Sequence, residues 1–187
     1  MKKPSDINAL IERLGRLGRS GRGEDAMNPV QWESLAYFAR ANRFSRSPGA
    51  LTEYLGATKG TVSQTINSLE RKGLVRKRVA AEDRRAISVD LTRSGEKMLA
   101  AKPPSAVDDA LAGLSAVERR QLGRSLEKVL SGALERRDMQ HFGLCRTCRF
   151  FQRNHKDGDP HRCGLLEEPL RDSDAELICR EQTPKNT

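Results

Sequence analysis

All four cysteines of the chain lie in its C-terminal stretch, in the spacing C-x2-C-x14-C-x15-C. A C-x2-C knuckle lets two thiolates converge on one ion, and two further cysteines can close a tetrahedron around it. Cysteines buried only for packing would instead be expected at scattered positions in a core. The spacing therefore predicts a metal site, with zinc as the favoured ion, whose ligands are Cys145, Cys148, Cys163 and Cys179.

A 4Fe-4S iron–sulfur cluster is the alternative occupant, because it also takes four cysteine ligands. Zinc would make the segment a structural unit that folds only with its metal, whereas a cluster would make it a redox or iron sensor. A neighbouring guanidinium would offset the charge of bound thiolates at every cysteine: Arg146, Arg149, Arg162 and Arg180. His161 is a possible substitute ligand, although an ordinary loop histidine is the simpler interpretation. His141 and His155 are interpreted as surface residues.

An enzyme is the rival class, because a C-x-x-C pair can exchange disulfides. A thiol oxidoreductase would place that pair at a helix start in a β-α-β setting, and it would leave Cys163 and Cys179 without a role. The sequence holds no Ser-His-Asp set, no glycine-rich phosphate loop and no paired acids in an apolar pocket. Because no such catalytic set appears, we expect a protein that is not an enzyme. Thiols stay reduced in the cytoplasm, so four clustered cysteines favour metal over disulfides.

The charge of the chain is uneven along its length. Residues 143–187 hold eight basic and eight acidic residues, so the rest of the chain carries the whole formal net charge of +9. A basic body followed by a neutral segment fits a nucleic-acid-binding domain joined to a different module, although a basic and inert surface has the same charge. No apolar run approaches the roughly 20 residues of a membrane span, and the start of the chain lacks the apolar region of a signal peptide. We therefore expect a cytoplasmic protein.

The basic body has the order helix, turn, helix and hairpin. After a helix from about Gln31 to Ala41, residues 47–56 predict a compact helix with a serine N-cap, proline in the first position and a left-handed glycine at the end. Residues 58–73 predict a second helix that buries an apolar stripe. Residues 74–79 and 87–91 predict a hairpin with a basic tip.

Further helices are expected on both sides of this body. Apolar residues recur at helical spacing from Ile7 to Leu17, and Thr92 can cap a short helix that ends before Pro103. A capping box from Ser115 to Glu118 opens a long helix. Its apolar face can be intrachain core or a dimer seam, and it comprises Leu122, Leu126, Val129, Leu130 and Ala133.

This order is that of a winged helix-turn-helix, whose second helix presents a polar face of the reach needed for base edges and phosphates. Gly60 allows close approach of the backbone, and free N–H groups at the helix start favour a phosphate. Arginines at the hairpin tip could enter the minor groove or contact the DNA backbone. The residues predicted to contact DNA are Lys59, Gly60, Thr61, Ser63, Gln64, Asn67, Arg71, Arg84 and Arg85.

From Asn28 to about Leu99 the sequence resembles the MarR family of bacterial transcriptional regulators. Its most specific parts are LERKGLV, from Leu69, and a wing pattern that comprises Asp83, Arg85, Leu91 and Thr92. The resemblance implies a homodimer held by N- and C-terminal helices, a recognition helix in the major groove and wing arginines in the minor groove. It also implies that Asp83 braces Arg85. Many members bind small aromatic anions, but this sequence identifies no pocket residues, so no small ligand is assigned.

These observations predict a mainly α protein. The predicted parts are an N-terminal dimerisation helix and linker (1–27), a winged helix-turn-helix (28–101), a C-terminal dimerisation helix (102–142) and a four-cysteine metal-binding module (143–187). The last of these lies outside the family pattern. The predicted function is that of a regulator, taken as a repressor, that binds a pseudo-palindromic operator in double-stranded DNA as a homodimer. If the module is a sensor, we expect it to act through the long helix that leads into it.

Overall fold

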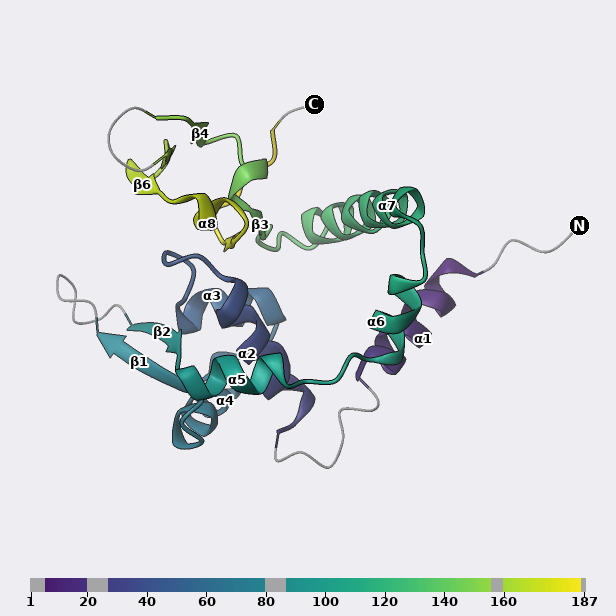
Figure 1. Cartoon of the computed structure of the whole chain (residues 1–187), viewed down its shortest axis with the longest axis horizontal. Coiled ribbons are helices and arrows are strands. Elements are labelled where there is room, and N and C mark those ends of the chain that lie inside the picture. Colours follow the sequence, from purple (N-terminus) through teal and green to yellow (C-terminus); the bar gives the residue numbers. More distant parts are fainter. Residues whose placement is uncertain (1–5, 20–26, 80–86, 156–159, 186–187) are drawn as a thin grey trace, which may run out of the picture.

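A computed structural model describes residues 6–19, 27–79, 87–155 and 160–185. Figure 1 shows three parts: a central lobe of helices with a two-stranded hairpin, a helical arm, and a small β-rich unit near the C-terminus. We call the last part the cysteine segment, residues 143–185. Among the described residues, no helix is long and apolar enough to cross a membrane.

The central lobe contains the predicted helix-turn-helix and hairpin. Its elements are α2 (Pro29–Arg40), α3 (Pro48–Leu55), α4 (Lys59–Arg71), β1 (Val75–Val79), β2 (Ile87–Leu91) and α5 (Arg93–Ala100). Ser47 caps α3 and Gly56 ends it at φ 59°, as predicted from local rules. The helix expected from Gln31 starts earlier, at Pro29, because Asn28 and Gln31 form a capping box.

One apolar core holds the lobe together. The predicted stripe of α4 is fully buried: Val62, Ile66 and Leu69 are each at most 1% exposed. They pack in one cluster with Leu35 of α2 and Leu51 of α3. Burying each such side chain stabilises the fold by roughly 1.5–3 kcal/mol, so the core fixes how α4 is presented.

The hairpin is joined to this core at its base. β1 and β2 pair antiparallel, with Val75 opposite Leu91 and Val79 opposite Ile87. Gly95 at the start of α5 lies so close to the hairpin that an added Cβ would meet the Leu74 carbonyl oxygen at 2.1 Å. Only glycine allows α5 to pack there.

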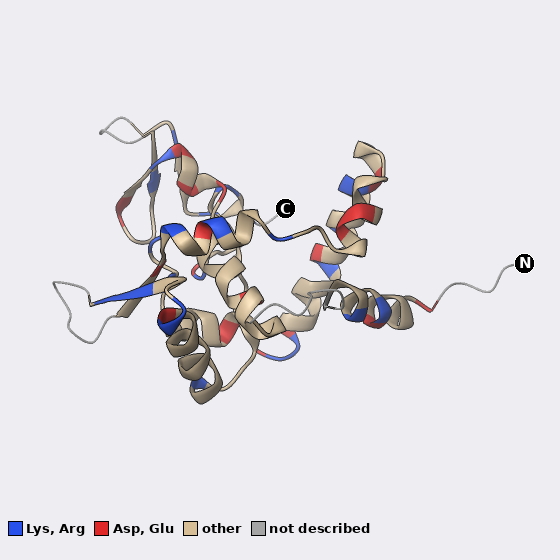
Figure 2. Ribbon diagram, turned by 60° about the horizontal axis from the view of Figure 1, so that its bottom comes forward, with Lys and Arg blue, Asp and Glu red and all other residues tan. Residues whose placement is uncertain are grey.

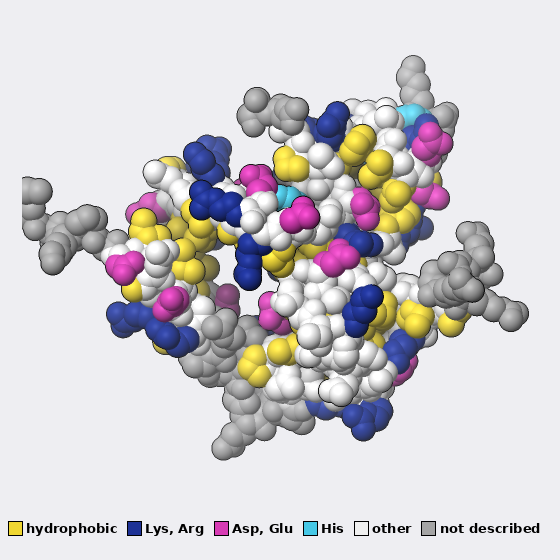
Figure 3. Space-filling model, turned by 180° about the vertical axis from the view of Figure 1, so that it is seen from behind, with side chains coloured by type: hydrophobic (Ala, Val, Ile, Leu, Met, Phe, Trp, Pro, Cys, Tyr) yellow, Lys and Arg dark blue, Asp and Glu magenta, His cyan; other side chains and the backbone are white. Residues whose placement is uncertain are grey.

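The helical arm contains α1 (Ile7–Arg19), α6 (Ala106–Ala112) and α7 (Ala116–Glu135), and α1 packs against α6. The capping box predicted for α7 is present, but α6 was not predicted; it has its own capping box, from Ser105 to Asp108. Figure 3 shows apolar side chains at the surface of this helical arm, at the left of the view. Leu126, Val129 and Leu130 of α7 are 47–59% exposed. Within one described chain, the apolar face of α7 is therefore not intrachain core.

The cysteine segment folds as short strands. It contains β3 (Gly143–Leu144), η1 (Cys145–Thr147), β4 (Phe151–Arg153), β5 (His161–Cys163), β6 (Glu168–Leu170), α8 (Asp172–Ala175) and β7 (Ile178–Cys179). β3 pairs with β7, and β4, β5 and β6 form a separate three-stranded sheet. Figure 1 shows the segment beside α3. A parallel bridge joins Ala41, directly after α2, to Ile178 in β7.

Candidate nucleic-acid interface and cysteine pair

The outer face of α4 is polar and exposed. Its exposed members are all the predicted DNA-contacting residues that fall on this helix: Lys59, Gly60, Thr61, Ser63, Gln64, Asn67 and Arg71. Thr58 caps the helix by accepting a hydrogen bond from the Thr61 backbone N–H at 3.2 Å. Because the apolar stripe is buried on the opposite side, α4 is fixed with donors and acceptors facing outward.

Lys77 ties the hairpin to α4. Its Nζ lies 2.8 Å from a carboxylate oxygen of Glu70 and also donates to Asn67 Oδ1. Hydrogen bonds from the Lys77 side chain and backbone lower the pKa of the Glu70 carboxyl. The carbonyl oxygen of Asn67 is thus occupied within the protein. Figure 2 shows the run of basic residues along β1.

The tip of the hairpin lies outside the described residues. The predicted DNA contacts Arg84 and Arg85 and the predicted brace Asp83 fall there, so the structure says nothing about them. The base of the hairpin is described, and it holds an ion-pair cluster. Asp90 on β2 lies 2.9 Å from Nε of Arg78 and 3.4 Å from a guanidinium nitrogen of Arg46.

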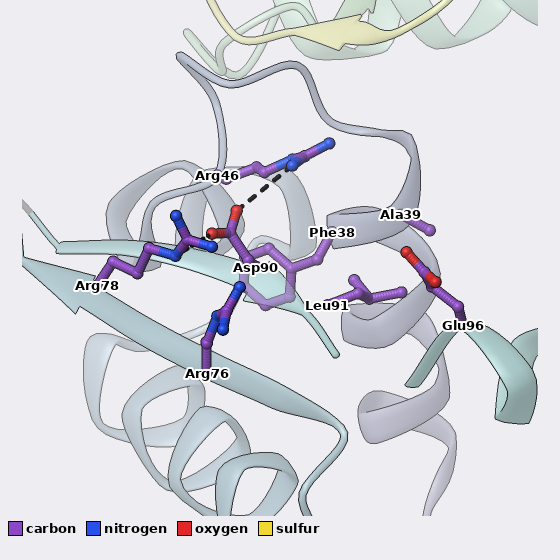
Figure 4. Close-up of a pocket in the computed structure, with 8 residues that line it drawn as sticks. All are labelled: Phe38, Ala39, Arg46, Arg76, Arg78, Asp90, Leu91 and Glu96. Atoms are coloured by element: carbon purple, nitrogen blue, oxygen red, sulfur yellow. Dashed lines mark hydrogen bonds and ion pairs between the residues drawn. The ribbon is translucent and has the colours of Figure 1, made fainter. Parts of the chain in front are cut away.

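This cluster lines an open cavity of about 470 Å³ between α2, α5 and the hairpin (Figure 4). The cavity is lined by Phe38, Ala39, Arg46, Arg76, Arg78, Asp90, Leu91 and Glu96. Two of its three arginines share Asp90, and Glu96 is the second carboxylate of the lining, so the lining carries three positive and two negative formal charges. Sequence reasoning identified none of these residues as a site.

Two of the four predicted metal ligands are in contact. Cys145 and Cys179 are buried, and each thiol is the largest influence on the pKa of the other. The interaction with Cys179 raises the pKa of Cys145, and the interaction with Cys145 lowers that of Cys179. Cys148 is buried in the same knuckle and accepts from the Thr183 backbone N–H at 3.5 Å, and Cys163 is half-buried. In the part of the chain that the structure describes, no three His, Cys, Asp or Glu side chains gather as a metal-binding group.

His161 is not the loop histidine of the simpler interpretation. It lies on β5, is 9% exposed, and its Nε2 is 3.1 Å from a carboxylate oxygen of Asp172. Its Nδ1 accepts from the Asn154 backbone N–H at 3.4 Å. Both ring nitrogens are therefore engaged within the segment. His141 and His155 are half-buried rather than fully at the surface.

Residues of the central lobe reach the cysteine sulfurs. Asn42, only 1% exposed, donates from Nδ2 to Cys145 Sγ at 3.3 Å. Hydrogen bonds from Asn42 and Ser45 also help to lower the pKa of Cys179, after the larger effect of Cys145. Sequence reasoning missed both residues, because they stand in an irregular stretch between α2 and α3 where no periodicity marks burial. The sequence marks them only by a mainly polar stretch, residues 42–47, which Phe44 interrupts ahead of Pro48.

The rest of the same stretch docks the cysteine segment onto the lobe. The Asn42 backbone N–H donates to the Ile178 carbonyl at 2.8 Å, and the Arg180 backbone N–H donates to Ser45 Oγ at 2.8 Å. The Arg180 guanidinium binds both carboxylate oxygens of Glu53 on α3, each at 2.7 Å. An arginine that the sequence assigned to balancing thiolate charge therefore pairs with a carboxylate of the lobe.

A second ion pair and an aromatic cluster complete this contact. Arg43 reaches Glu168 at 3.3 Å, Asp174 at 3.5 Å and the Pro169 carbonyl at 2.7 Å. The rings of Tyr37, Tyr54 and Phe142 pack together edge to face or tilted, with centroids 4.6–6.2 Å apart. The segment is thus attached to the lobe over α2, α3 and the turn between them.

Comparison with known proteins agrees with the fold of the lobe. Residues 27–86 match the model of the MarR family. The transcriptional regulator HosA of Escherichia coli O127:H6 (strain E2348/69 / EPEC) is 39% identical over 83 residues, which are 43% of this chain and 62% of HosA. The match thus spans about three fifths of that relative's length. The cysteine segment lies beyond the residues matched by the family model.

Solved structures share the architecture. A MarR transcriptional regulator from Methanosarcina mazei Go1 aligns with a TM-score of 0.56 at 25% identity, over 69% of this chain and 96% of that one. The S. aureus MepR–DNA complex aligns with a TM-score of 0.52 at 24% identity, over 68% of this chain and 94% of that one. The part of the chain that the family model matches thus lies in a winged helix-turn-helix, the fold that these solved structures share.

Proposed function

We propose that the protein is a DNA-binding transcriptional regulator of the MarR type and acts as a repressor. The observation that carries this proposal is the exposed polar face of α4, fixed by its buried stripe and linked to the hairpin by Lys77. The similar fold of MepR has been solved with DNA bound, which supports placing α4 in the major groove. The wing arginines Arg84 and Arg85 would reach the adjacent minor groove or backbone.

We propose a homodimer as the DNA-binding unit. The support is the exposed apolar face of α7, together with α1, whose Ile7, Leu14 and Leu17 are 49–67% exposed. A second copy would cover these faces and remove their apolar surface from water. Two α4 helices would then read half-sites about 34–36 Å apart, so the operator is expected to be pseudo-palindromic.

We propose that the four cysteines bind a metal, with zinc first and a 4Fe-4S cluster as the alternative. The support is the contact between Cys145 and Cys179 and the N–H donors aimed at the sulfurs from Asn42 and Thr183. Neutral thiols are weak acceptors, whereas thiolates bound to a cation are strong ones, so this donor set suits ligation. Bound zinc would cross-link the segment, and a bound cluster would add redox chemistry.

DNA binding is tested by selecting operator fragments and measuring their affinity by fluorescence anisotropy at several salt concentrations. The paired change of Ser63 and Gln64 to alanine should relax sequence preference, because base contacts specify, while retaining non-specific binding. Arg85→Ala should weaken binding to all sequences and lower the salt slope by about one. Lys128→Ala, on α7 and away from the proposed DNA-binding face, is the control and should leave binding unchanged. If selected DNA bound no better than random DNA, the proposal would be refuted.

The metal is tested by anaerobic purification of the full chain. One zinc per chain in a colourless protein supports the structural site, and a brown protein with iron and sulfide supports the cluster. A metal-free protein in which Cys145 and Cys148 exchange a disulfide rapidly would instead favour a thiol oxidoreductase.

A further inference from the structure

We infer that the turn between α2 and α3, residues 41–46, transmits the state of the cysteine site to the wing, so that metal binding and DNA binding are linked. This inference rests on the proposed metal site and deepens it by naming the regulatory route. We call these residues the junction turn. It contacts the cysteine segment on one side and the hairpin on the other.

The cysteine side of the junction turn is buried and hydrogen-bonded to the segment by both backbone and side chains. Asn42 is 1% exposed and Ser45 0%. Asn42 donates its backbone N–H to the Ile178 carbonyl and its side-chain Nδ2 to Cys145 Sγ. Its side-chain Oδ1 is buried and has no hydrogen-bond partner among the described residues. A change at the Cys145 sulfur therefore acts directly on a buried amide, whose other sulfur partner is Cys179 in the same site.

The wing side of the junction turn is Arg46. Its carbonyl accepts from the Val89 backbone N–H at 2.7 Å, and Val89 is a fully buried residue of β2. Its guanidinium donates to the Ala41 carbonyl at 3.0 Å and reaches Asp90, which also binds Arg78 of β1 (Figure 4). A displacement of the turn would thus move both strands of the hairpin.

This route is shorter than the one expected from the sequence. In Figure 1, α7 extends away from the lobe, and its apolar face is exposed in a single chain. The junction turn joins a buried sulfur contact at Asn42 to a buried strand contact at Arg46 within a few residues. Packed cores respond as units, so coupling should follow this contact path rather than the exposed helix.

Metal binding and operator binding are thermodynamically linked if the junction turn couples the two sites. If metal alters operator affinity by some factor, DNA alters metal affinity by the same factor, typically about 5–150-fold. We expect the operator Kd of the full chain to differ at least about fivefold between zinc-loaded and chelated protein. Asn42→Ala and Arg46→Ala should each bring that ratio towards one, because each cuts one side of the junction turn.

The experiment measures zinc content, operator Kd and amide hydrogen exchange on the same samples of full-length protein. Loss of zinc should speed exchange at the amides of Asn42 and Val89. These amides make the hydrogen bonds that join the junction turn to the cysteine segment and to the hairpin. Asn42→Ser and Arg46→Lys are milder variants that keep the test valid if an alanine variant misfolds. A Gly-Gly insertion after Arg137 interrupts the connection from α7 to the segment, and we expect it to leave the ratio unchanged.

The outcomes separate the inference from the function on which it rests. A ratio that falls in the junction variants while zinc stays bound supports the inference. A large ratio that survives those variants, or that is lost only on the Gly-Gly insertion, overturns the route. A wild-type chain that binds zinc with a ratio of one refutes coupling but leaves the metal site standing. A wild-type chain that binds neither zinc nor iron refutes the metal site, and the inference fails with it.

Discussion

Asp90 is the residue on which the base of the hairpin depends. It balances Arg46 from the junction turn and Arg78 from β1, and its side chain is 21% exposed. A carboxylate shared by two arginines fixes both guanidinium groups at once. Asp90 thus braces the base of the wing, beside the Val89–Arg46 backbone hydrogen bond and the Lys77–Glu70 ion pair.

Asp90→Asn should lower stability by roughly 1 kcal/mol, since a partly exposed pair is screened by solvent. We also expect weaker operator binding, because two arginines lose their common partner and the hairpin loses its brace. Urea unfolding and anisotropy measure the two effects. Asp109→Asn on exposed α6 is the control and should change neither. Operator binding that matched wild type would show that Asp90 does not orient the wing.

At the scale of elements, α4 depends on its first turn. Thr58 Oγ1 accepts the Thr61 N–H and also lies 2.9 Å from the Thr61 hydroxyl. The cap orders the part of the helix that we propose faces phosphate. A frayed first turn would lose both stability and pre-organised donors.

Thr58→Ala should cost about 1 kcal/mol of folding free energy, whereas Thr58→Ser should restore most of it by keeping the cap oxygen. Thermal unfolding followed by circular dichroism gives the comparison. Equal melting temperatures for the two variants would show that the cap contributes nothing measurable.

The exposed apolar face of α7 is the proposed contact between the two copies of the homodimer. Leu126→Asp places a charge in the middle of its apolar face, and we expect the dimer to dissociate because a buried unpaired charge is costly. Sedimentation velocity should then show monomers and operator affinity should fall sharply. Lys128→Asp introduces the same side chain elsewhere on the helix and is expected to leave the dimer intact. A dimeric Leu126→Asp protein would place the seam elsewhere.

On the scale of the whole molecule, the cysteine segment and the lobe are held together by contacts between distant parts of the sequence. Arg180 binds Glu53 through two hydrogen bonds, and that bond raises the pKa of the arginine. Tyr37, buried beneath this pair, donates its hydroxyl to the Ser45 carbonyl at 2.7 Å, and burial raises its pKa. Arg180 of the segment thus pairs with lobe groups through both its backbone and its side chain.

A double-mutant cycle of Arg180→Ala and Glu53→Ala should give a coupling energy of about 0.5–1 kcal/mol, because the two side chains remain 39% and 38% exposed and solvent screens the pair. Chemical unfolding of the full chain supplies the four free energies. Strictly additive effects would mean that the pair does not attach the segment to the lobe.

Local rules explain what the sequence could predict. Ser47, Gly56, Thr92 and the Ser115 capping box act within one or two turns, so their residue types alone identified them. α6 was missed because it is short and buries no residue. The docking of the segment could not be predicted, since Asn42 and Cys145 are 103 positions apart and no local pattern marks their contact. The wing-side role of Arg46 was missed for the same reason, since Arg46 and Asp90 are 44 positions apart.

The burial of Asn42 and Ser45 also constrains how the protein can evolve. These polar side chains are satisfied largely by the cysteine segment, so a chain that lost the segment would leave them facing water or unpaired. The junction turn and the segment should therefore be inherited together or replaced together. Other proteins that combine this lobe with such a segment can be sought by two features of their sequences: a polar pair at these two positions, and a C-x2-C pair in the C-terminal stretch.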